Sequence, residues 1–298
     1  MLASPLKLTV ITTPDQLRGR GLKLLPNPVK ERCQKAGIPT LSPAKLRDSV
    51  VEKNVAQIRP ECFVVASYGK MIPESWLQIP SKAAFNLHPS LLPKYRGAAP
   101  ITWQILDGEK ETGVSVAEVT KDLDAGDLFH QIRVSLHEKE TTESLTKKLA
   151  DLARQALEEV FSMMAEQRLT RIHQEPSKSS YARKLSKEDG RLDLALPAVE
   201  QERRVRAFYP WPGAFIGYQG QPLRVVEAAV DSIFCSEAEA GTLLEIHSQS
   251  YLRVQTGRGS LRIFKVQLPG RRVVSAQEFA NGERLKPGLV FQNLSPRK

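Results

Sequence analysis

The sequence predicts an α/β domain built around a mostly parallel β-sheet, followed by a smaller β-rich domain. In the first half of the chain, short apolar runs rich in β-branched and aromatic residues alternate with helical patterns, as in a parallel sheet covered by helices. A polar segment then interrupts this alternation, and closely spaced strand patterns follow it. At 298 residues, the chain is long enough for about two domains. We therefore expect domains at residues 1–169 and 190–298, joined by a linker at 170–189.

The elements of the first domain follow from hydrophobic periodicity. Strands are expected where short apolar runs occur, at residues 6–12, 62–68, 83–88, 111–120 and 127–136. Helices are expected at residues 28–37, 44–58 and 143–168, and the last of these has the clearest helical stripe of apolar side chains. Because strands and helices alternate, most neighbouring strands should run parallel.

The second half of the chain has a different residue composition and hydrophobic pattern. Residues 170–190 contain a proline, several serines and several cations with little apolar content, which is typical of a linker. Beyond residue 190, strand patterns alternate around turn residues at the spacing of a small barrel or sandwich.

The charge balance gives a first indication of a partner. The chain has 43 Lys and Arg against 33 Asp and Glu, a net charge of +10. This excess favours an anionic partner, because cations that neutralise phosphates gain free energy from counterion release. A basic surface also promotes solubility alone, so both interpretations stay open.

Cysteine usage and hydropathy exclude several classes of protein. The three cysteines, Cys33, Cys62 and Cys235, lack the close spacings that bind zinc, so we expect neither a disulfide framework nor a metal site. No apolar stretch approaches the roughly 20 residues that a membrane helix needs. We therefore expect a cytosolic protein without membrane contact.

The densest group of chemically useful residues follows the expected strand at 83–88. Asn86 and His88 lie two positions apart, so their side chains should leave the same face at the carboxyl end of that strand. An amide can donate to an oxygen that gains negative charge, and an imidazole can move a proton near neutral pH. This pair suits acyl transfer. A packing histidine and an asparagine that favours a turn remain the structural alternatives.

Two loops add further candidates. The acidic loop at 122–127 contains Asp124, one of the carboxylates that could reach the imidazole and fix its tautomer, although acidic residues beside Ala-Gly also favour turns. Residues 18–23 hold two glycines and three cations, which suits a mobile basic finger better than a phosphate-binding fingerprint.

These motifs together resemble the formyltransferase superfamily that uses 10-formyltetrahydrofolate. The resemblance rests on Asn-Leu-His-Pro-Ser-Leu-Leu-Pro-Lys-Tyr-Arg-Gly-Ala-Ala-Pro at 86–100, Glu-Thr-Gly-Val at 111–114 and Leu-Asp-Ala-Gly-Asp at 123–127. It implies a Rossmann-like catalytic domain followed by an OB-like barrel, with 10-formyltetrahydrofolate as formyl donor and no metal. It also places Asn86, His88 and Asp124 at the catalytic positions. The stretch that contacts folate corresponds to Ser90, Leu91, Leu92 and Pro93.

Other motifs are similar to the branch of this superfamily that formylates methionyl-initiator tRNA. They lie at residues 14–15, 18–23, 26–30, 184–190, 206–213 and 275–279, in the family's order. The resemblance implies an enzyme of translation initiation whose partners are tRNA and folate, and we expect it to act as a monomer. Arg20 falls in the loop that, in the family, inserts beside the acceptor stem. The cations expected at the tRNA interface are Arg20, Lys23, Arg203, Arg204, Arg206, Arg271 and Arg272.

Two alternatives remain at this stage. The same folate chemistry can serve an amino sugar or a purine precursor, although the basic charge and the β-rich second half disfavour this acceptor. The family also opens with a further strand, a glycine-containing turn and a helix, whereas this chain begins near the end of that helix. The first domain is therefore expected to lack a central strand, and an inactive RNA-binding remnant is the other alternative.

Overall fold

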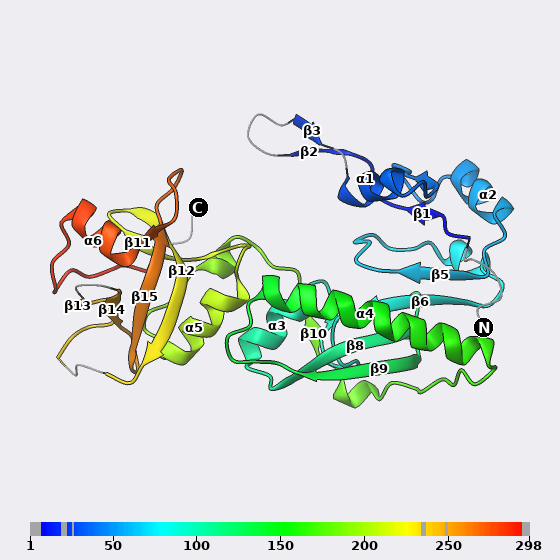
Figure 1. Cartoon of the computed structure of the whole chain (residues 1–298). Helices are drawn as coiled ribbons and strands as arrows, with labels where there is room; N and C mark the ends of the chain where they lie inside the picture. The colour runs from blue at the N-terminus through cyan, green and yellow to red at the C-terminus, as the bar shows by residue number, and fades with distance from the viewer. Residues whose placement is uncertain (1–6, 19–22, 26, 234–236, 248–249, 294–298) are drawn as a thin grey trace. The chain divides into compact units, whose positions relative to one another are not determined.

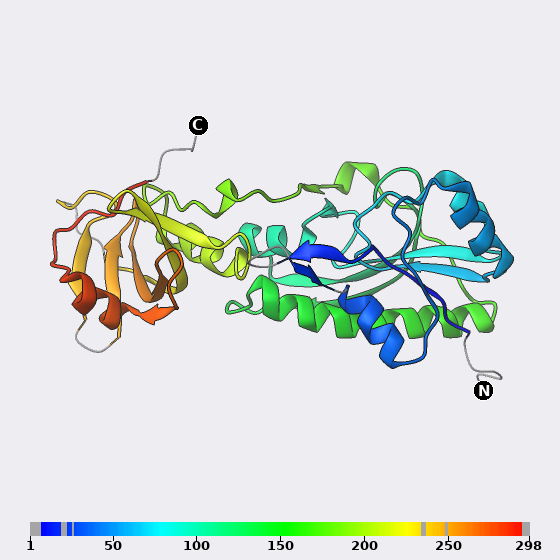
Figure 2. The ribbon, with the colours of Figure 1, turned by 90° about the horizontal axis from the view of Figure 1, so that it is seen from above.

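The computed structural model describes residues 7–18, 23–25, 27–233, 237–247 and 250–293. It divides into two compact units (Figures 1 and 2). Unit 1 comprises residues 1–87 and 117–127, and unit 2 comprises residues 88–116 and 128–298. In the described part of the chain, no helix has the length and apolar character needed to cross a membrane.

The elements up to the end of the first long apolar strand are short. Their bounds are β1 (Val10–Ile11), β2 (Gln16–Arg18), β3 (Lys23–Leu25), α1 (Pro28–Lys35), β4 (Thr40–Leu41), α2 (Ser49–Gln57), β5 (Cys62–Val65), the 3₁₀ helix η1 (Glu74–Gln78) and β6 (Ala83–His88). Both helices begin at a capping side chain. Asn27 accepts a hydrogen bond from the Val29 N–H before α1, and Asp48 accepts one from the Val50 N–H before α2.

Two pairs of strands in unit 1 are parallel, as predicted, whereas β2 and β3 pair antiparallel. β1 pairs with β4, and β5 pairs with β6 with Val65 opposite Asn86. Among the described residues, β1 and β4 form their own two-stranded sheet, whereas β5 and β6 belong to a four-stranded sheet of order β5-β6-β8-β9. The strand expected at 6–12 is therefore only two residues long where the structure describes it, because it has only β4 as a neighbour.

The elements from residue 96 to the start of the second sheet are β7 (Arg96–Gly97), α3 (Pro100–Asp107), β8 (Glu111–Glu118), β9 (Leu128–Ser135), α4 (Thr142–Ala165), η2 (Pro176–Lys178), β10 (Tyr181–Ala182), η3 (Glu188–Gly190) and α5 (Ala198–Ala207). β8 and β9 form an antiparallel hairpin. The Glu118 N–H donates to the Asp127 carbonyl near the turn, and the Leu136 N–H donates to the Lys110 carbonyl at the open end.

The long helix α4 is the one that the sequence predicts most clearly. It begins with a capping box in which the side chain of Thr141 accepts from the Ser144 N–H and the Ser144 hydroxyl accepts from the Thr141 N–H. Its buried stripe includes Leu145, Leu149 and Val160, and it packs against β9. Figure 1 shows α4 running alongside β8 and β9.

The C-terminal part of unit 2 is a closed, antiparallel sheet. Its elements are β11 (Ala214–Tyr218), β12 (Gln221–Asp231), β13 (Leu243–Ile246), β14 (Leu252–Gln255), β15 (Ser260–Gln267), β16 (Val274–Ser275) and α6 (Ala276–Glu283). The strand order is β11-β12-β15-β14-β13, and residues 288–292 join the two edges: Gly217 pairs with Gln292 and Thr242 pairs with Val290. This closure buries a continuous core and confirms the predicted β-rich domain.

The segment expected to be a linker makes ordered contacts. β10 pairs in parallel with β7, with Tyr181 opposite Arg96 and Ala182 opposite Gly97. A Cβ on Gly97 would lie 2.7 Å from the Ala182 carbonyl oxygen, so glycine permits this close approach. Figure 2 shows the extended course of the chain between α4 and α5.

Candidate active site

The carboxyl end of β6 carries two of the candidate residues. Asn86 and His88 are two positions apart on this strand, so both side chains leave the same face. The sequence predicts this arrangement, because a short apolar run sets the strand and the period of two sets the face. The surroundings of each side chain required the structure.

Asn86 is paired with Asp124. The Asn86 Nδ2 donates to Asp124 Oδ1 at 2.8 Å. Asp124 has a positive φ of 53° in the turn between β8 and β9, a conformation that Asp adopts at modest cost. Gly126 closes this turn, since a Cβ there would lie 2.1 Å from the Glu118 carbonyl oxygen. Asp124, predicted as a partner for the imidazole, thus accepts from the Asn86 amide. A second Nδ2–H of Asn86 can donate to a substrate.

His88 is buried and has a backbone partner. Its side chain is 4% exposed, and Nε2 lies 2.8 Å from the Tyr95 carbonyl oxygen. Because a carbonyl oxygen only accepts, Nε2 must carry the proton, and in the neutral ring the lone pair is on Nδ1. This defines which ring nitrogen can act as a base.

The stretch predicted to contact folate is fixed by a buried hydrogen-bond network. The Ser90 hydroxyl, fully buried, donates to the Lys94 carbonyl at 2.7 Å. Ser115 Oγ donates to the Ser90 carbonyl and accepts from the Leu92 N–H. The Ser90 and Leu92 side chains are buried and support the loop from inside. Leu91 and Pro93 are half-buried.

Sequence reasoning missed Ser115, Gln131 and Gln104, which support this loop. Gln131 Nε2 donates to the Leu92 carbonyl and to Ser115 Oγ. Gln104 Nε2 donates to the Pro89 carbonyl at 2.9 Å, and its Oε1 accepts from the buried Thr112 hydroxyl at 2.6 Å. The available signal was a polar residue inside an otherwise apolar strand or helix pattern, since buried polar groups must be paired.

The cations predicted at the tRNA interface have different environments. Arg20 lies outside the described residues, and Lys23 is described only by its backbone in β3. Arg271 and Arg272 are exposed on the loop after β15, and Arg272 pairs with Glu278 at 2.9 Å.

Arg206 has partners within the protein. Its guanidinium makes a double hydrogen bond to Glu202 and a third to the Glu140 carbonyl, and its side chain is only 15% exposed. Three of its five N–H donors are therefore used within the protein. Arg206 thus ties α5 to the start of α4.

Tyr95 is the most unusual residue near the site, and sequence reasoning did not select it. It has a positive φ of 61° and is 7% exposed. Its hydroxyl lies 2.9 Å from Asp107 Oδ2 and 2.8 Å from Glu109 Oε1. Burial, together with these two carboxylates, raises the pKa of the phenol, so the hydroxyl stays protonated.

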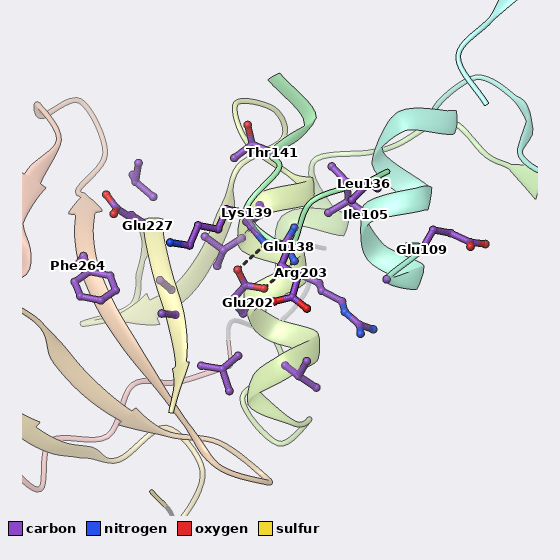
Figure 3. Close-up of a pocket in the computed structure, with 18 of the residues that line it drawn as sticks. Ile105, Glu109, Leu136, Glu138, Lys139, Thr141, Glu202, Arg203, Glu227 and Phe264 are labelled. Atoms are coloured by element: carbon purple, nitrogen blue, oxygen red, sulfur yellow. Dashed lines mark hydrogen bonds and ion pairs between the residues drawn. The ribbon is translucent and has the colours of Figure 1, made fainter. Parts of the chain in front are cut away.

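A cleft of about 650 Å³ is lined by residues from the ends of α3 and β9 and from α5 and β12 (Figure 3). Arg203 lines it and rests on Gly108, where a Cβ would lie 2.3 Å from the guanidinium carbon. Figure 3 shows the Glu109 side chain directed away from this cleft. The cleft therefore adds no group to the Asn86 and His88 site.

Comparison with known protein families gives two matches that together span most of the chain. Residues 6–161 match the formyl transferase family, and residues 184–284 match the formyl transferase C-terminal domain. The methionyl-tRNA formyltransferase of Geobacter metallireducens is 37% identical over 282 residues, which cover 95% of this chain and 89% of that protein. The methionyl-tRNA formyltransferase of Nitrosococcus oceani is 40% identical over 283 residues, covering 95% and 87%.

Solved structures show the same fold at lower identity. HypX from Aquifex aeolicus, in complex with tetrahydrofolic acid, superposes with a TM-score of 0.63 at 15% identity and covers 91% of this chain and 46% of that one. The sugar 3N-formyl transferase WlaRD has a TM-score of 0.62 at 14% identity, covering 89% and 98%. Both domains, in the order predicted from the motifs, thus have known counterparts, and the chain belongs to the formyl transferase family.

Proposed function

We propose that this protein transfers the formyl group of 10-formyltetrahydrofolate to the amino group of methionyl-initiator tRNA. The observation that supports this most directly is the Asn86–Asp124 hydrogen bond beside His88 on β6. This pair offers an oriented amide donor and a nearby base in a chain that is 35–40% identical to methionyl-tRNA formyltransferases over about 95% of its length. An amino-sugar acceptor is less well supported, because the sugar formyltransferases share only the fold at this level of identity.

In this proposal the chain's own residues stabilise charge and move one proton. The Asn86 N–H donates to the formyl oxygen, which becomes an oxyanion when the amine nitrogen bonds to the formyl carbon. His88 Nδ1 accepts the proton that the attacking amine loses, while Nε2 keeps its bond to the Tyr95 carbonyl. The carbon–nitrogen bond to the folate then breaks, and the imidazolium returns its proton to the departing nitrogen.

The donor substrate fits against the loop that follows β6. Leu91 and Pro93 present half-buried apolar surface, and Ser90 and Leu92 hold the loop rigid from behind. A loop fixed by a buried network places a bound formyl group reproducibly, which is how positioning contributes to rate. We therefore assign folate contact to Leu91 and Pro93 and loop support to Ser90 and Leu92.

The domains have separate tasks in this proposal. Residues 1–169 perform the chemistry, and residues 190–298 contribute RNA contacts through exposed cations such as Arg271 and Arg272. Arg20 and Lys23 add a contact to the acceptor stem in this proposal. The net charge of +10 supports an anionic macromolecule as the acceptor.

A single-turnover assay with 10-formyltetrahydrofolate and charged initiator tRNA tests the function. Asn86→Ala should lower the rate by about 10²- to 10³-fold, the usual effect of removing one oxyanion donor. Asn281→Ala and His137→Ala, at exposed positions, are matched controls and should react like the parent. If Asn86→Ala and His88→Ala both stay within about threefold of the parent, the site lies elsewhere; preferential formylation of an amino sugar would reject the acceptor.

A further inference from the structure

We propose that Tyr95 is a positioning residue whose backbone carbonyl holds His88 in the Nε2–H tautomer, and whose phenol fixes that carbonyl by anchoring to Asp107 and Glu109. The proposal deepens the function proposed above, because it identifies Nδ1 of His88 as the atom that accepts the proton. It concerns contacts within unit 2 alone.

The backbone of Tyr95 adopts a conformation that needs support. A φ of 61° places this aromatic residue in the left-handed region, which costs roughly 1–2 kcal/mol for a residue with a Cβ. Such conformations persist where the surroundings determine them, and they concentrate at functional sites. Here the conformation turns the Tyr95 carbonyl toward the ring of His88, seven residues earlier, at 2.8 Å.

Three contacts hold Tyr95 in this conformation. Its N–H donates to the Ser180 hydroxyl at 2.9 Å, and the next N–H, of Arg96, donates to the Ser180 carbonyl at 2.9 Å. Its hydroxyl reaches Asp107 and Glu109 at the far end of the ring. These contacts hold Tyr95 at its amide, at the peptide unit that carries its carbonyl, and at its phenol.

The phenol is a good anchor because it remains a donor. The hydroxyl has one proton, so it donates to one carboxylate at a time, and the neighbouring carboxylates oppose its ionisation. Lys94 Nζ, 2.9 Å from Glu109 Oε1, lowers the pKa of Glu109 and keeps that acceptor charged. The groups facing the phenol are thus Asp107, Glu109 and, behind Glu109, Lys94.

The hydrogen bond from His88 to the Tyr95 carbonyl determines which ring nitrogen accepts a proton. With Nε2–H donated to the carbonyl, the lone pair of neutral His88 is on Nδ1, and protonation there gives an imidazolium that keeps the Nε2–H bond. If the carbonyl moves away, the ring can adopt the Nδ1–H tautomer, whose lone pair is on the opposite nitrogen. In a serine-protease triad, the wrong tautomer lowers kcat by about 10⁴-fold.

The first measurement uses the unmodified full-length protein. ¹⁵N NMR of the imidazole nitrogens, with the His88 signals identified by their loss in His88→Gln, should show Nε2 protonated and Nδ1 unprotonated above the ring pKa. A ring protonated on Nδ1 in the neutral state would overturn the proposal. This readout needs no turnover, so it stands apart from the test of the proposed function.

The second measurement asks whether the phenol matters. Tyr95→Phe should populate the second tautomer and lower kcat by about 10- to 100-fold, as expected for a displaced catalytic group, with KM for both substrates within about twofold. Tyr181→Phe is the matched control, since Tyr181 is 66% exposed and should behave like the parent. Glu109→Gln keeps an acceptor oxygen for the phenol and should retain the native tautomer. A folded Tyr95→Phe variant with native tautomer and kcat would overturn the role of the phenol.

Discussion

At the scale of single residues, Gly113 shows how tightly the loop beside the site is packed. A Cβ at this position on β8 would lie 2.0 Å from the Ile132 carbonyl oxygen and 2.6 Å from Leu91 Cδ2. The Ile132 carbonyl oxygen is fixed in the backbone and cannot rotate away as a side chain could. Adding a Cβ would therefore displace the backbone of β8, and the Leu91 side chain would have to move as well. The sequence alone identified this glycine only as part of a motif, and the structure supplies the physical reason for it.

We expect Gly113→Ala to destabilise the protein by roughly 1–3 kcal/mol through overpacking and to raise KM for the folate substrate, because Leu91 moves. Urea unfolding and steady-state kinetics measure these two effects. Gly282→Ala in α6 is the control: nothing lies within 4 Å of its Cβ, so it should be neutral or stabilise the helix by up to about 1 kcal/mol. Equal behaviour of the two variants would contradict the predicted clash.

Asp124 gives a second prediction at this scale. Asn at this position tolerates the positive φ but removes the charge that orients the Asn86 amide, so Asp124→Asn should fold normally. A hydrogen bond to a charged group contributes about 1.5–3 kcal/mol, which corresponds to a loss of roughly 10- to 150-fold in kcat. Single-turnover rates and thermal unfolding of both proteins provide the measurement. A parental rate would show that the amide is oriented without Asp124.

The residues of the site were predictable to different degrees. Asn86 and His88 follow from one apolar strand and its period of two, and Asp124 follows from the acidic turn after the next strand. Tyr95 could not be found in this way, because its proposed role depends on a left-handed backbone and on two carboxylates, one at the end of α3 and one just after it. Sequence reasoning also did not show that Glu202, one helical turn before Arg206, pairs with its guanidinium.

At the scale of elements, residues 181–190 anchor the start of the barrel domain. Asp189 accepts hydrogen bonds from the Arg183 guanidinium and from the backbone N–H and hydroxyl of Ser186. The Arg183 guanidinium is the main cause that lowers the pKa of Asp189 from 3.8 to about 2. Because its pKa is depressed in the folded state, Asp189 stabilises the fold above about pH 4, and this stabilisation is lost as the pH falls toward 2.

Asp189→Asn should therefore lower the free energy of unfolding by about 1–2 kcal/mol at pH 7, a value reduced from the full linkage figure because Arg183 is 52% exposed. Urea titrations from pH 7 to pH 3 should show the difference from the parent shrinking below about pH 4. Glu188→Gln, which removes an exposed partner of Arg191, is the control and should have little effect at any pH. A difference independent of pH would point to lost packing instead.

Sequence periodicity predicted several of the longer elements and missed two-residue strands such as β7 and β10. The α4 helix and the β6, β8 and β9 strands are long enough for a repeated apolar pattern. β10 has only two residues, and its pairing with β7 is set by contacts more than 80 residues away in the chain, so its sequence has the composition of a linker. The strand expected at 6–12 is shorter in the structure than its apolar run predicts. Pairing with neighbouring strands, rather than apolar content, determines where a strand ends.

At the scale of the whole molecule, many of the 43 cations are committed to partners within the protein. Arg253 contacts Glu245 and Asp231, Arg206 contacts Glu202, and Arg183 contacts Asp189. Net charge alone therefore overstates the surface that can attract RNA, and individual environments decide which cations contribute.

Arg271 and Arg206 give opposite predictions. Arg271→Ala should leave stability unchanged and lower the slope of log K against log salt for tRNA binding by about one, as for a lost phosphate contact. Arg206→Ala should instead destabilise the protein, because it leaves the largely buried Glu202 without its partner, and should leave that slope unchanged. Filter binding at several salt concentrations measures the slope, and a lower slope for Arg206→Ala would identify Arg206 as an RNA contact.

The contact between Tyr95 and Ser180 can form only late in the synthesis of the chain. Ser180 leaves the ribosome 85 residues after Tyr95, so at about 5–20 residues per second the two meet only about 4–17 s later. Until then the loop that ends at Tyr95 lacks the hydroxyl that holds its amide. In a nascent chain, the loop after β6 is thus completed by the segment that leads into the barrel domain. If Tyr95 has the role proposed above, His88 is correctly positioned only once that segment has been translated.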